Sequence, residues 1–366
     1  MKRLFALYLA ALTLLTLWGC TPETPAESTA APTVPCTELL TGWQTIDGDT
    51  YCFSDDGTPL TGWRVDLPGS PGDRCYLDQT GKVLTGWQEI EGKRYYFAES
   101  GAMTTGWVEE NGEYFYCGID GAMFTGLLNI QGNGYYFDRD GKRCSGWQEI
   151  GENTYYFGQD GIMAVGSVEI EGQLHHFSPK GIWIPLVNPW NMLPEGYEVE
   201  LVNVTERDRL ETRCAQALKD MLAACKEAGY EPSIVSAYRT QEEQEFLFDR
   251  KVKYYTDRGW SRTAARTEAA KEIAIPGTSE HQLGLAVDLM DETYPYLDKY
   301  QANTPAQKWL MEHCHEYGFI LRYPVGSTQI TGIIYEPWHY RYVGQEIARE
   351  IMDLGITLEE YLETAE

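Results

Sequence analysis

The sequence predicts two folded regions of different class: an all-β hairpin solenoid of seven repeats over residues 41–184, followed by an α+β domain over residues 185–366. The first observation is a unit of 20 residues that begins at Thr41 and occurs seven times, with one copy longer by four residues. The second is the end of that period after Trp183, where helical and strand patterns begin to alternate irregularly. A length of 366 residues exceeds the usual size of one domain and agrees with this division.

Residues 1–19 have the pattern of a signal peptide. The basic start MKR precedes an apolar run of 15 residues, which is too short to span a bilayer comfortably. The run ends in LWGC, which resembles the bacterial lipobox, whose cysteine is acylated and becomes the first residue of the mature protein. We therefore predict a lipoprotein that is anchored through Cys20 on the extracellular face of a Gram-positive type of membrane and reaches into the cell wall. Simple secretion that leaves Cys20 as a plain thiol is the alternative.

Residues 20–40 are rich in Pro, Thr, Ala and Ser and contain few apolar side chains, so we predict a lipid-anchored, disordered linker. The net charge of −26, from 55 acidic and 29 basic residues, argues against a nucleic-acid partner, because phosphate-binding surfaces need clustered Lys and Arg. Eight cysteines lie outside the lipobox without the CxxC spacing of a zinc site. We expect most of them to be small buried residues, with room for one or two disulfides.

Each repeat, such as TGWQEIEGKRYYF, reads as a short strand, a glycine-containing turn and an aromatic strand, which together predict a β-hairpin. One hairpin cannot bury its own apolar face, so successive copies should stack. We expect the GW tryptophans and the tyrosine pairs to supply the core between the copies. These residues are Trp43, Trp63, Trp87, Trp107 and Trp147, with tyrosines such as Tyr95, Tyr96, Tyr155 and Tyr156.

The repeats resemble the choline-binding and glucan-binding repeats of Gram-positive surface proteins and toxins. That resemblance implies choline, a glycan or teichoic acid as ligand, while a structural spacer is the equal alternative. The tryptophan that precedes the tyrosine pair in choline-binding repeats is replaced here, for example by Thr50 or Thr154, so the aromatic cage looks incomplete. His175 and His176 occupy the place of a tyrosine pair, and we interpret them as aromatic replacements rather than metal ligands.

In the α+β region, apolar residues at helical spacing predict a helix that Thr205 caps and Gly229 ends. The stretch PSIVSAYR has the pattern of a strand. A second helix is predicted over residues 304–318, with Thr304 as its cap and Pro305 in its first turn.

Two of the six histidines stand in suggestive surroundings. SEHQLGLAVD places His281 beside a glycine-containing turn and Asp288 inside an apolar strand, where a buried carboxylate needs a cation or a hydrogen-bond partner. YEPWHY places Glu336 three residues before His339, and the proline between them excludes a helical zinc motif. Two histidines and one aspartate make a catalytic zinc site with a free position for water, and Glu336 is the natural general base.

In order and spacing, SAYR, SEHQLGLAVD and EPWH resemble the signatures of VanY-type zinc D-alanyl-D-alanine carboxypeptidases, over about residues 186–350. The resemblance implies a domain with a central antiparallel sheet, and Zn²⁺ bound by His281, Asp288 and His339. It also implies that Glu336 is the general base and acid. Arg239 would stabilise the oxyanion or bind the substrate carboxylate.

The same resemblance implies that Ser279 and Gln244 contact the substrate, and that Ser236, Tyr238 and Trp338 lie in the pocket wall. The predicted function is hydrolysis of the terminal D-alanine from peptidoglycan stem peptides at the cell envelope. An L,D-carboxypeptidase or endopeptidase of the same fold is the alternative within this class, because the pocket beyond the metal selects the substrate. A non-catalytic wall-binding lipoprotein is the alternative outside it, and the presence of Glu336 argues against that alternative.

Overall fold

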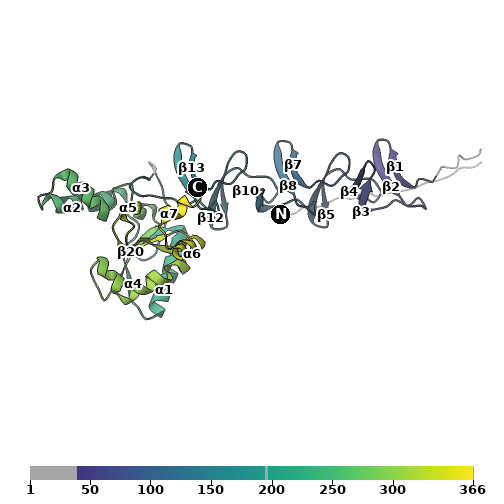
Figure 1. Cartoon of the computed structure of the whole chain (residues 1–366). Coiled ribbons are helices and arrows are strands. Elements are labelled where there is room, and N and C mark those ends of the chain that lie inside the picture. The colour runs from purple at the N-terminus through teal and green to yellow at the C-terminus, as the bar shows by residue number, and fades with distance from the viewer. Residues whose placement is uncertain (1–38, 194–196, 366) are drawn as a thin grey trace, which may run out of the picture. The chain divides into compact units, whose positions relative to one another are not determined.

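The computed structural model describes residues 39–193 and 197–365 (Figure 1). The predicted signal peptide, the predicted lipidation site Cys20 and most of the predicted linker lie outside these residues. Within the described residues, no helix is both long and apolar enough to cross a membrane. The chain divides after Leu84 into two compact units, of which the first holds two of the repeats and the second holds the other five together with the α+β domain.

All seven repeats form two-stranded antiparallel hairpins, as the sequence predicts. The tight turns follow from local chemistry: in the first hairpin Asp47 and Gly48 both have positive φ, of 52° and 90°, which matches the twist of paired strands. The hairpins are β1 (Gly42–Ile46) with β2 (Asp49–Phe53), β3 (Gly62–Leu67) with β4 (Ser70–Leu77), β5 (Gly86–Ile90) with β6 (Lys93–Phe97), β7 (Gly106–Glu110) with β8 (Glu113–Cys117), β9 (Gly126–Ile130) with β10 (Asn133–Phe137), β11 (Gly146–Ile150) with β12 (Asn153–Phe157), and β13 (Gly166–Ile170) with β14 (Gln173–Phe177).

Backbone hydrogen bonds between repeats recur at the period of the sequence. In the second unit, the amide of Met123 donates to the carbonyl of Arg94 over 2.8 Å, and the amide of Arg143 donates to the carbonyl of Tyr114 over 2.7 Å. The amide of Trp183 donates in the same way to the carbonyl of Thr154 over 2.8 Å. In each of these three cases, a hairpin is hydrogen-bonded to the segment that follows the next hairpin along the chain.

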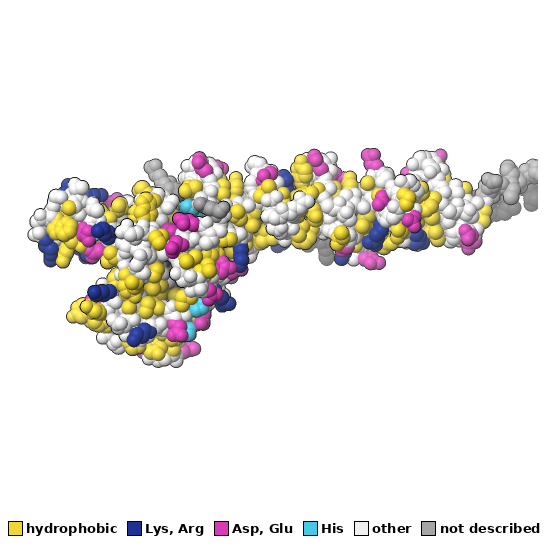
Figure 2. Space-filling view, in the orientation of Figure 1, with side chains coloured by type: hydrophobic (Ala, Val, Ile, Leu, Met, Phe, Trp, Pro, Cys, Tyr) yellow, Lys and Arg dark blue, Asp and Glu magenta, His cyan; other side chains and the backbone are white. Residues whose placement is uncertain are grey.

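The prediction that the GW tryptophans and the tyrosine pairs form the core holds only in part. Trp87 packs against a buried cluster and Tyr155 is buried, whereas two of the tryptophans are exposed. Trp107 and Trp147 remain 40% and 39% exposed, whereas Phe97, Phe137, Phe157 and Phe177 at the ends of the second strands are fully buried. The reason is the two-residue alternation of strands: Trp147 is paired with Tyr156, so the next residue, Phe157, points to the opposite face. Figure 2 shows hydrophobic side chains reaching the surface along the hairpins, with acidic groups at several of their tips.

The second region is an α+β domain built on one four-stranded antiparallel sheet in the order β17-β18-β20-β19. Its elements are β15 (Leu201–Asn203), β16 (Arg209–Glu211), α1 (Thr212–Glu227), β17 (Pro232–Ser236), α2 (Gln241–Thr256), α3 (Arg262–Glu272), β18 (Ala286–Asp291), α4 (Pro305–His313), β19 (Phe319–Tyr323), α5 (Thr328–Thr331), β20 (Glu336–Tyr342), α6 (Gln345–Leu354) and α7 (Leu358–Glu363), with short 3-10 turns at Glu280–Leu283, Lys299–Asn303 and Cys314–Tyr317.

Helix α1 begins later than predicted. Glu211 caps it, while Thr205 instead closes a turn in which its hydroxyl donates to Asp208 over 2.8 Å. Residues 201–211 form the small β15–β16 hairpin because the local turn satisfies Thr205 before a helix can start. Helix α4 starts as predicted, with Thr304 as cap and Pro305 in the first turn.

Two large hydrophobic clusters hold the α+β domain together, and a smaller one packs α2 against α3. The first packs α1 and α4 against the sheet through residues such as Leu218, Leu310, Val287 and Tyr340. The second joins the last repeats to the C-terminal helices, and it includes Phe157, Ile182, Ile184, Ile320, Ile347, Ile351, Leu358 and Tyr361. The seven cysteines in the described part of the chain are free thiols, and six of them are buried.

Candidate metal centre

The sheet places the predicted ligands on the face opposite its main core. Val287 and Leu289 pack into the core, so Asp288 between them points the other way. His339 on β20 is the direct cross-strand partner of Asp288 and shares that face. The 3-10 turn at Glu280–Leu283 brings His281 to the same point, where the left-handed Gly284 ends the turn.

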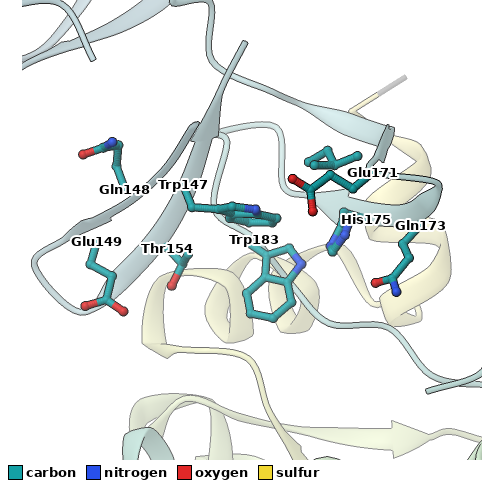
Figure 3. Close-up of a pocket in the computed structure, with 9 residues that line it drawn as sticks. Trp147, Gln148, Glu149, Thr154, Glu171, Gln173, His175 and Trp183 are labelled. Carbon is teal, nitrogen blue, oxygen red and sulfur yellow. The ribbon is translucent and has the colours of Figure 1, made fainter. Parts of the chain in front are cut away.

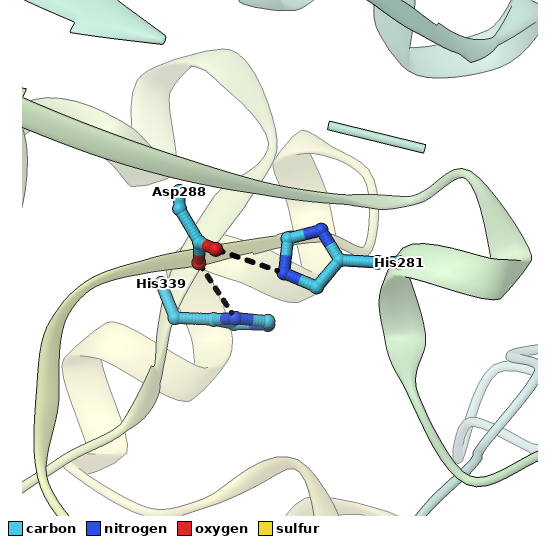
Figure 4. A group of neighbouring side chains, drawn as sticks. All are labelled: His281, Asp288 and His339. Atoms are coloured by element: carbon cyan, nitrogen blue, oxygen red, sulfur yellow. Dashed lines mark hydrogen bonds and ion pairs between the residues drawn. The ribbon is translucent and has the colours of Figure 1, made fainter. Parts of the chain in front are cut away.

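The three side chains converge (Figure 4). His281 Nε2 lies 3.2 Å from Asp288 Oδ2, and His339 Nδ1 lies 3.1 Å from Asp288 Oδ1. One ligand atom from each of the three residues lies within 4.8 Å of the others, and all three residues are buried. Two imidazole nitrogens and a carboxylate oxygen in one buried cluster are a donor set that fits a catalytic zinc ion.

The remaining ring nitrogens are bonded to the protein and set the orientation of both imidazoles. His281 Nδ1 lies 2.7 Å from the backbone carbonyl of Ala237, so this nitrogen is the N–H donor and Nε2 is left for a metal. His339 Nε2 lies 3.3 Å from Glu280 Oε2, which leaves Nδ1 toward the cluster. A partner on the outer nitrogen of each histidine is the usual arrangement in metal sites.

The electrostatics of the cluster follow from burial and charge. Burial raises the pKa of Asp288, but the two histidines and Arg239 outweigh it and hold that pKa well below 3.8. Burial and Arg239 lower the pKa of His281 to about 4. Burial also lowers the pKa of His339, but hydrogen bonds to Asp288 and Glu280 outweigh it and raise this pKa to about 9. At neutral pH and without a metal, these pKa values leave Asp288 ionised, His281 neutral and His339 protonated.

Glu336 lies beside His339 at the start of β20, where the pairing with β19 is irregular. Leu321 pairs with Tyr340 but Tyr323 pairs with Glu336, so β20 contains extra residues between these two pairs. Glu336 Oε2 lies 3.9 Å from His339 Nδ1, and both residues line the same cavity. Burial raises the pKa of Glu336 to about 8, with His339 opposing and Asp288 adding to the rise.

Arg239 lies against the cluster and is held by three side chains. Its Nη2 donates to Asp288 Oδ2 over 2.7 Å, its Nε to Ser236 Oγ over 2.8 Å, and its Nη1 to Gln244 Oε1 over 3.3 Å. Gln244 is fully buried and donates to the carbonyl of Ala274 over 2.7 Å. The structure thus places Gln244 behind Arg239, as a support for the guanidinium.

A cavity of about 220 Å³ opens onto the metal ligands. It is lined by the predicted residues Arg239, Ser279, His281, Asp288, Glu336, Trp338 and His339, and also by Lys251, Glu272, Ile273, Ala274, Leu297, Tyr323, Ile333 and Ile334. Gln244, Ser236 and Tyr238 are not in its lining, and Tyr238 faces the guanidinium of Arg209 instead.

The sequence did not point to Glu280, although it lies between two predicted residues. The two arginines that neutralise Glu280, Arg322 and Arg341, come from strands far away in the chain. Only its position beside His281 was available as a signal. Lys251 and Glu272 form an ion pair at the edge of the cavity and were also missed, because neither stands in a short, distinctive motif.

Comparisons with known proteins agree with this geometry. Residues 207–345 match the model of the VanY family, D-alanyl-D-alanine carboxypeptidase. A carboxypeptidase-like protein of Bacillus subtilis, YodJ, is 37% identical over 197 residues, which cover 51% of this chain and 68% of that protein. The chain belongs to the VanY family.

A D-alanyl-D-alanine carboxypeptidase of Enterococcus faecalis is 42% identical to the VanY domain over 179 residues, which cover 49% of this chain and 65% of that relative. The chain thus spans just under two thirds of the length of that relative. A crystal structure of the vancomycin-resistance D,D-pentapeptidase VanY in complex with Zn(II) is 42% identical, and the match covers 49% of this chain and 97% of that chain, with a TM-score of 0.45.

The region before the VanY domain matches repeat families. Residues 84–125 and 144–181 match a choline-binding repeat, and residues 41–58 match a cell wall binding repeat. Among the last repeats, a cavity of about 640 Å³ is lined by aromatic and polar groups (Figure 3). The residues are Trp147, Gln148, Glu149, Thr154, Ile170, Glu171, Gln173, His175 and Trp183.

The aromatic groups of this cavity can be compared with the aromatic cage of choline-binding repeats, which the sequence predicts to be incomplete. Trp183 is hydrogen-bonded through its backbone to Thr154, and its ring lies 5.5 Å from that of Trp147. The ring of His175 lies 5.1 Å from Trp147 in an edge-on arrangement. His175 therefore acts as an aromatic replacement, as predicted, and Trp183 supplies an indole beside the position where Thr154 has none.

Proposed function

We propose that this protein is a zinc-dependent carboxypeptidase that removes the terminal D-alanine from peptidoglycan stem peptides. The observation that carries the proposal is the convergence of His281, Asp288 and His339, with Glu336 Oε2 3.9 Å from His339 Nδ1. A protein that only bound peptide would have no need for a buried carboxylate beside the metal ligands. Membership of the VanY family supports the same reaction.

His281 Nε2, Asp288 and His339 Nδ1 would hold the zinc ion. When bound, zinc supplies a Lewis acid that lowers the pKa of a water molecule and polarises a carbonyl group. Glu336 is favoured in its ionised form beside a divalent cation, so it can accept a proton from the attacking water. It then delivers this proton to the nitrogen of the leaving D-alanine.

Arg239 is suited to stabilise negative charge. Each of its Nη atoms carries a further N–H besides the one bonded to Asp288 or Gln244. Both atoms belong to a side chain that lines the cavity. These donors can bind the oxyanion of the tetrahedral intermediate or the terminal carboxylate of the substrate. Ser236 and Gln244 fix the plane of the guanidinium and so pre-organise it.

The size of the cavity favours a small terminal residue. A volume of about 220 Å³ lies below the usual size of a ligand pocket. The lining combines the cations Arg239 and Lys251 with carboxylates and with apolar groups such as Ile333. A terminal D-alanine with its free carboxylate fits this chemistry. An L,D-carboxypeptidase or an endopeptidase of the same fold is the second candidate, because the same metal centre would serve either substrate.

The repeats are proposed to form a solenoid that holds the enzyme in the cell wall. The recurring hydrogen bonds between hairpins support stacking, and the cavity at Trp147 and Trp183 offers aromatic faces to choline, a glycan or teichoic acid. An acylated Cys20 and an extended linker would place the protein at the extracellular side of the membrane. Labelling with a fatty-acid analogue, lost in Cys20→Ser, tests the anchor.

The test of the activity is digestion of purified muropeptides, with the products weighed by mass spectrometry. Loss of one D-alanine from pentapeptides, with tetrapeptides and cross-links intact, supports the proposal. Glu336→Gln should retain zinc and lose turnover. A Glu336→Gln variant that cleaves as fast as the parent would overturn the assigned role, and cleavage of tetrapeptides or cross-links would move the protein to the second candidate.

A further inference from the structure

A network of buried charges lies behind the metal ligand His339. It consists of Glu280, Arg322, Arg341 and Glu359, which come from the 3-10 turn at Glu280–Leu283, β19, β20 and α7. The side chains of Glu280, Arg322 and Arg341 are fully buried, and that of Glu359 is 10% exposed. We call these four residues the buried charge network.

Every member of the network is hydrogen-bonded. Arg322 Nε and Arg341 Nη1 both donate to Glu280 Oε1, over 2.7 Å and 2.8 Å. The two Nη atoms of Arg322 form a bidentate contact with Glu359: Nη1 donates to Oε2 over 2.8 Å, and Nη2 donates to Oε1 over 2.6 Å. Two carboxylates thus balance two guanidinium groups, which is the condition under which buried charges are tolerated.

The network touches the metal centre at one atom. Glu280 Oε1 is occupied by both arginines, and its other oxygen, Oε2, lies 3.3 Å from His339 Nε2. The opposite nitrogen of the ring, Nδ1, points to Asp288. Because the arginines fix the plane of the carboxylate, the position of Glu280 Oε2 determines the rotation of the imidazole and therefore where Nδ1 points.

The network also reaches the segment that links the repeats to the α+β domain. Asn188 Nδ2 donates to Glu359 Oε1 over 3.1 Å, and Arg341 Nη2 donates to the carbonyl of Pro185 over 2.6 Å. Asn188 and Glu359 both lie outside residues 207–345, where the chain matches the VanY family. The contacts that hold the two arginines of the network therefore come partly from segments that the family match does not include.

We propose that Glu280, Arg322 and Glu359 are positioning residues that hold His339 in the orientation that zinc binding requires. Helix α7 then contributes to the metal centre through Glu359. This inference rests on the zinc site of the proposed function and adds residues that do not contact the metal. The competing interpretation is that the network only stabilises the fold. The two differ in what they predict for zinc affinity in protein that remains folded.

The experiment measures zinc affinity by competition with a chromophoric chelator, using the full chain and the variants Glu280→Gln, Glu359→Gln and Glu363→Gln. Glu363 is an exposed residue on the same helix and serves as the matched control. Circular dichroism on the zinc-free proteins sets a temperature at which each variant is folded. The absorption spectrum of the cobalt-loaded protein reports ligand geometry independently of activity.

Substitutions around metal ligands typically weaken metal binding by about 10-fold to 100-fold. We expect Glu280→Gln to fall in this range with an altered cobalt spectrum, Glu359→Gln to lose about 10-fold, and Glu363→Gln to match the parent. Parental zinc affinity in folded Glu280→Gln and Glu359→Gln would overturn the proposal. If Glu280→Gln does not fold, Glu359→Gln decides alone, because Glu359 does not touch His339.

The outcome is separable from that of the proposed function. A parent protein that binds zinc tightly but releases no D-alanine would refute the carboxypeptidase and leave the positioning network intact. A parent that releases D-alanine, with zinc affinity unchanged in both network variants, would refute the network and leave the carboxypeptidase intact.

Discussion

Replacing Glu336 by Gln should stabilise the zinc-free protein while it abolishes catalysis. Burial raises the pKa of Glu336 from 4.5 to about 8, against the opposing effect of His339. Between these two values the folded protein holds a proton on Glu336 that the unfolded chain has lost. The stability associated with the neutral carboxyl is fully present below pH 4.5 and is lost as the pH rises through about 8.

The magnitude follows from the distance between the two pKa values. Each pH unit between them is worth about 1.4 kcal/mol, and Gln is neutral at every pH. Relative to the parent, Glu336→Gln should therefore gain nothing at about pH 4, about 3 kcal/mol at about pH 7, and about 5 kcal/mol at about pH 9. Only 7% of the residue is exposed, so solvent screening leaves most of this difference in place.

The assay is urea unfolding at several pH values in the presence of a chelator, followed by circular dichroism. Glu363→Gln, which removes an exposed carboxylate, is the control and should follow the parent throughout. A stability difference between Glu336→Gln and the parent that stays constant from pH 4 to pH 9, or that reverses its sign, would refute the reasoning about burial.

Three further results are expected. His281→Ala should bind no zinc and release no D-alanine, which elemental analysis and an assay of free D-alanine will show. Arg239→Lys retains the charge but loses the fork, and steady-state kinetics should record a fall in kcat of about 10²-fold to 10³-fold. Phe157→Ala leaves a cavity in the core shared by the last repeats and the C-terminal helices, and it should lower the free energy of unfolding in denaturant by about 3–5 kcal/mol. The control Phe246→Ala, at a residue that is 66% exposed, should change that free energy by less than about 0.5 kcal/mol.

Much of the local structure was readable from the chain. The period of 20 residues and its turn glycines predicted seven hairpins, because a hairpin depends on residues only a few positions apart. The same local information misplaced the start of α1, since Thr205 can cap a helix or close a turn with Asp208 equally well. It also misassigned Trp107 and Trp147, because a strand's buried face depends on what packs against it.

The sequence by itself determined which side chains have the right chemistry: His281, Asp288, His339, Glu336 and Arg239 all stand in short, distinctive motifs. Only the tertiary structure decided how they meet. Asp288 and His339 are cross-strand partners although they stand 51 residues apart in the chain, and no motif records that pairing.

The contacts that support the metal ligands could not be predicted from local sequence patterns. Glu280 is held by residues 42 and 61 positions away, and Arg322 is held by Glu359 at the far end of the domain. A buried charge must find its counter-charge wherever the fold presents one, and that partner is chosen by distance in space rather than by spacing along the chain.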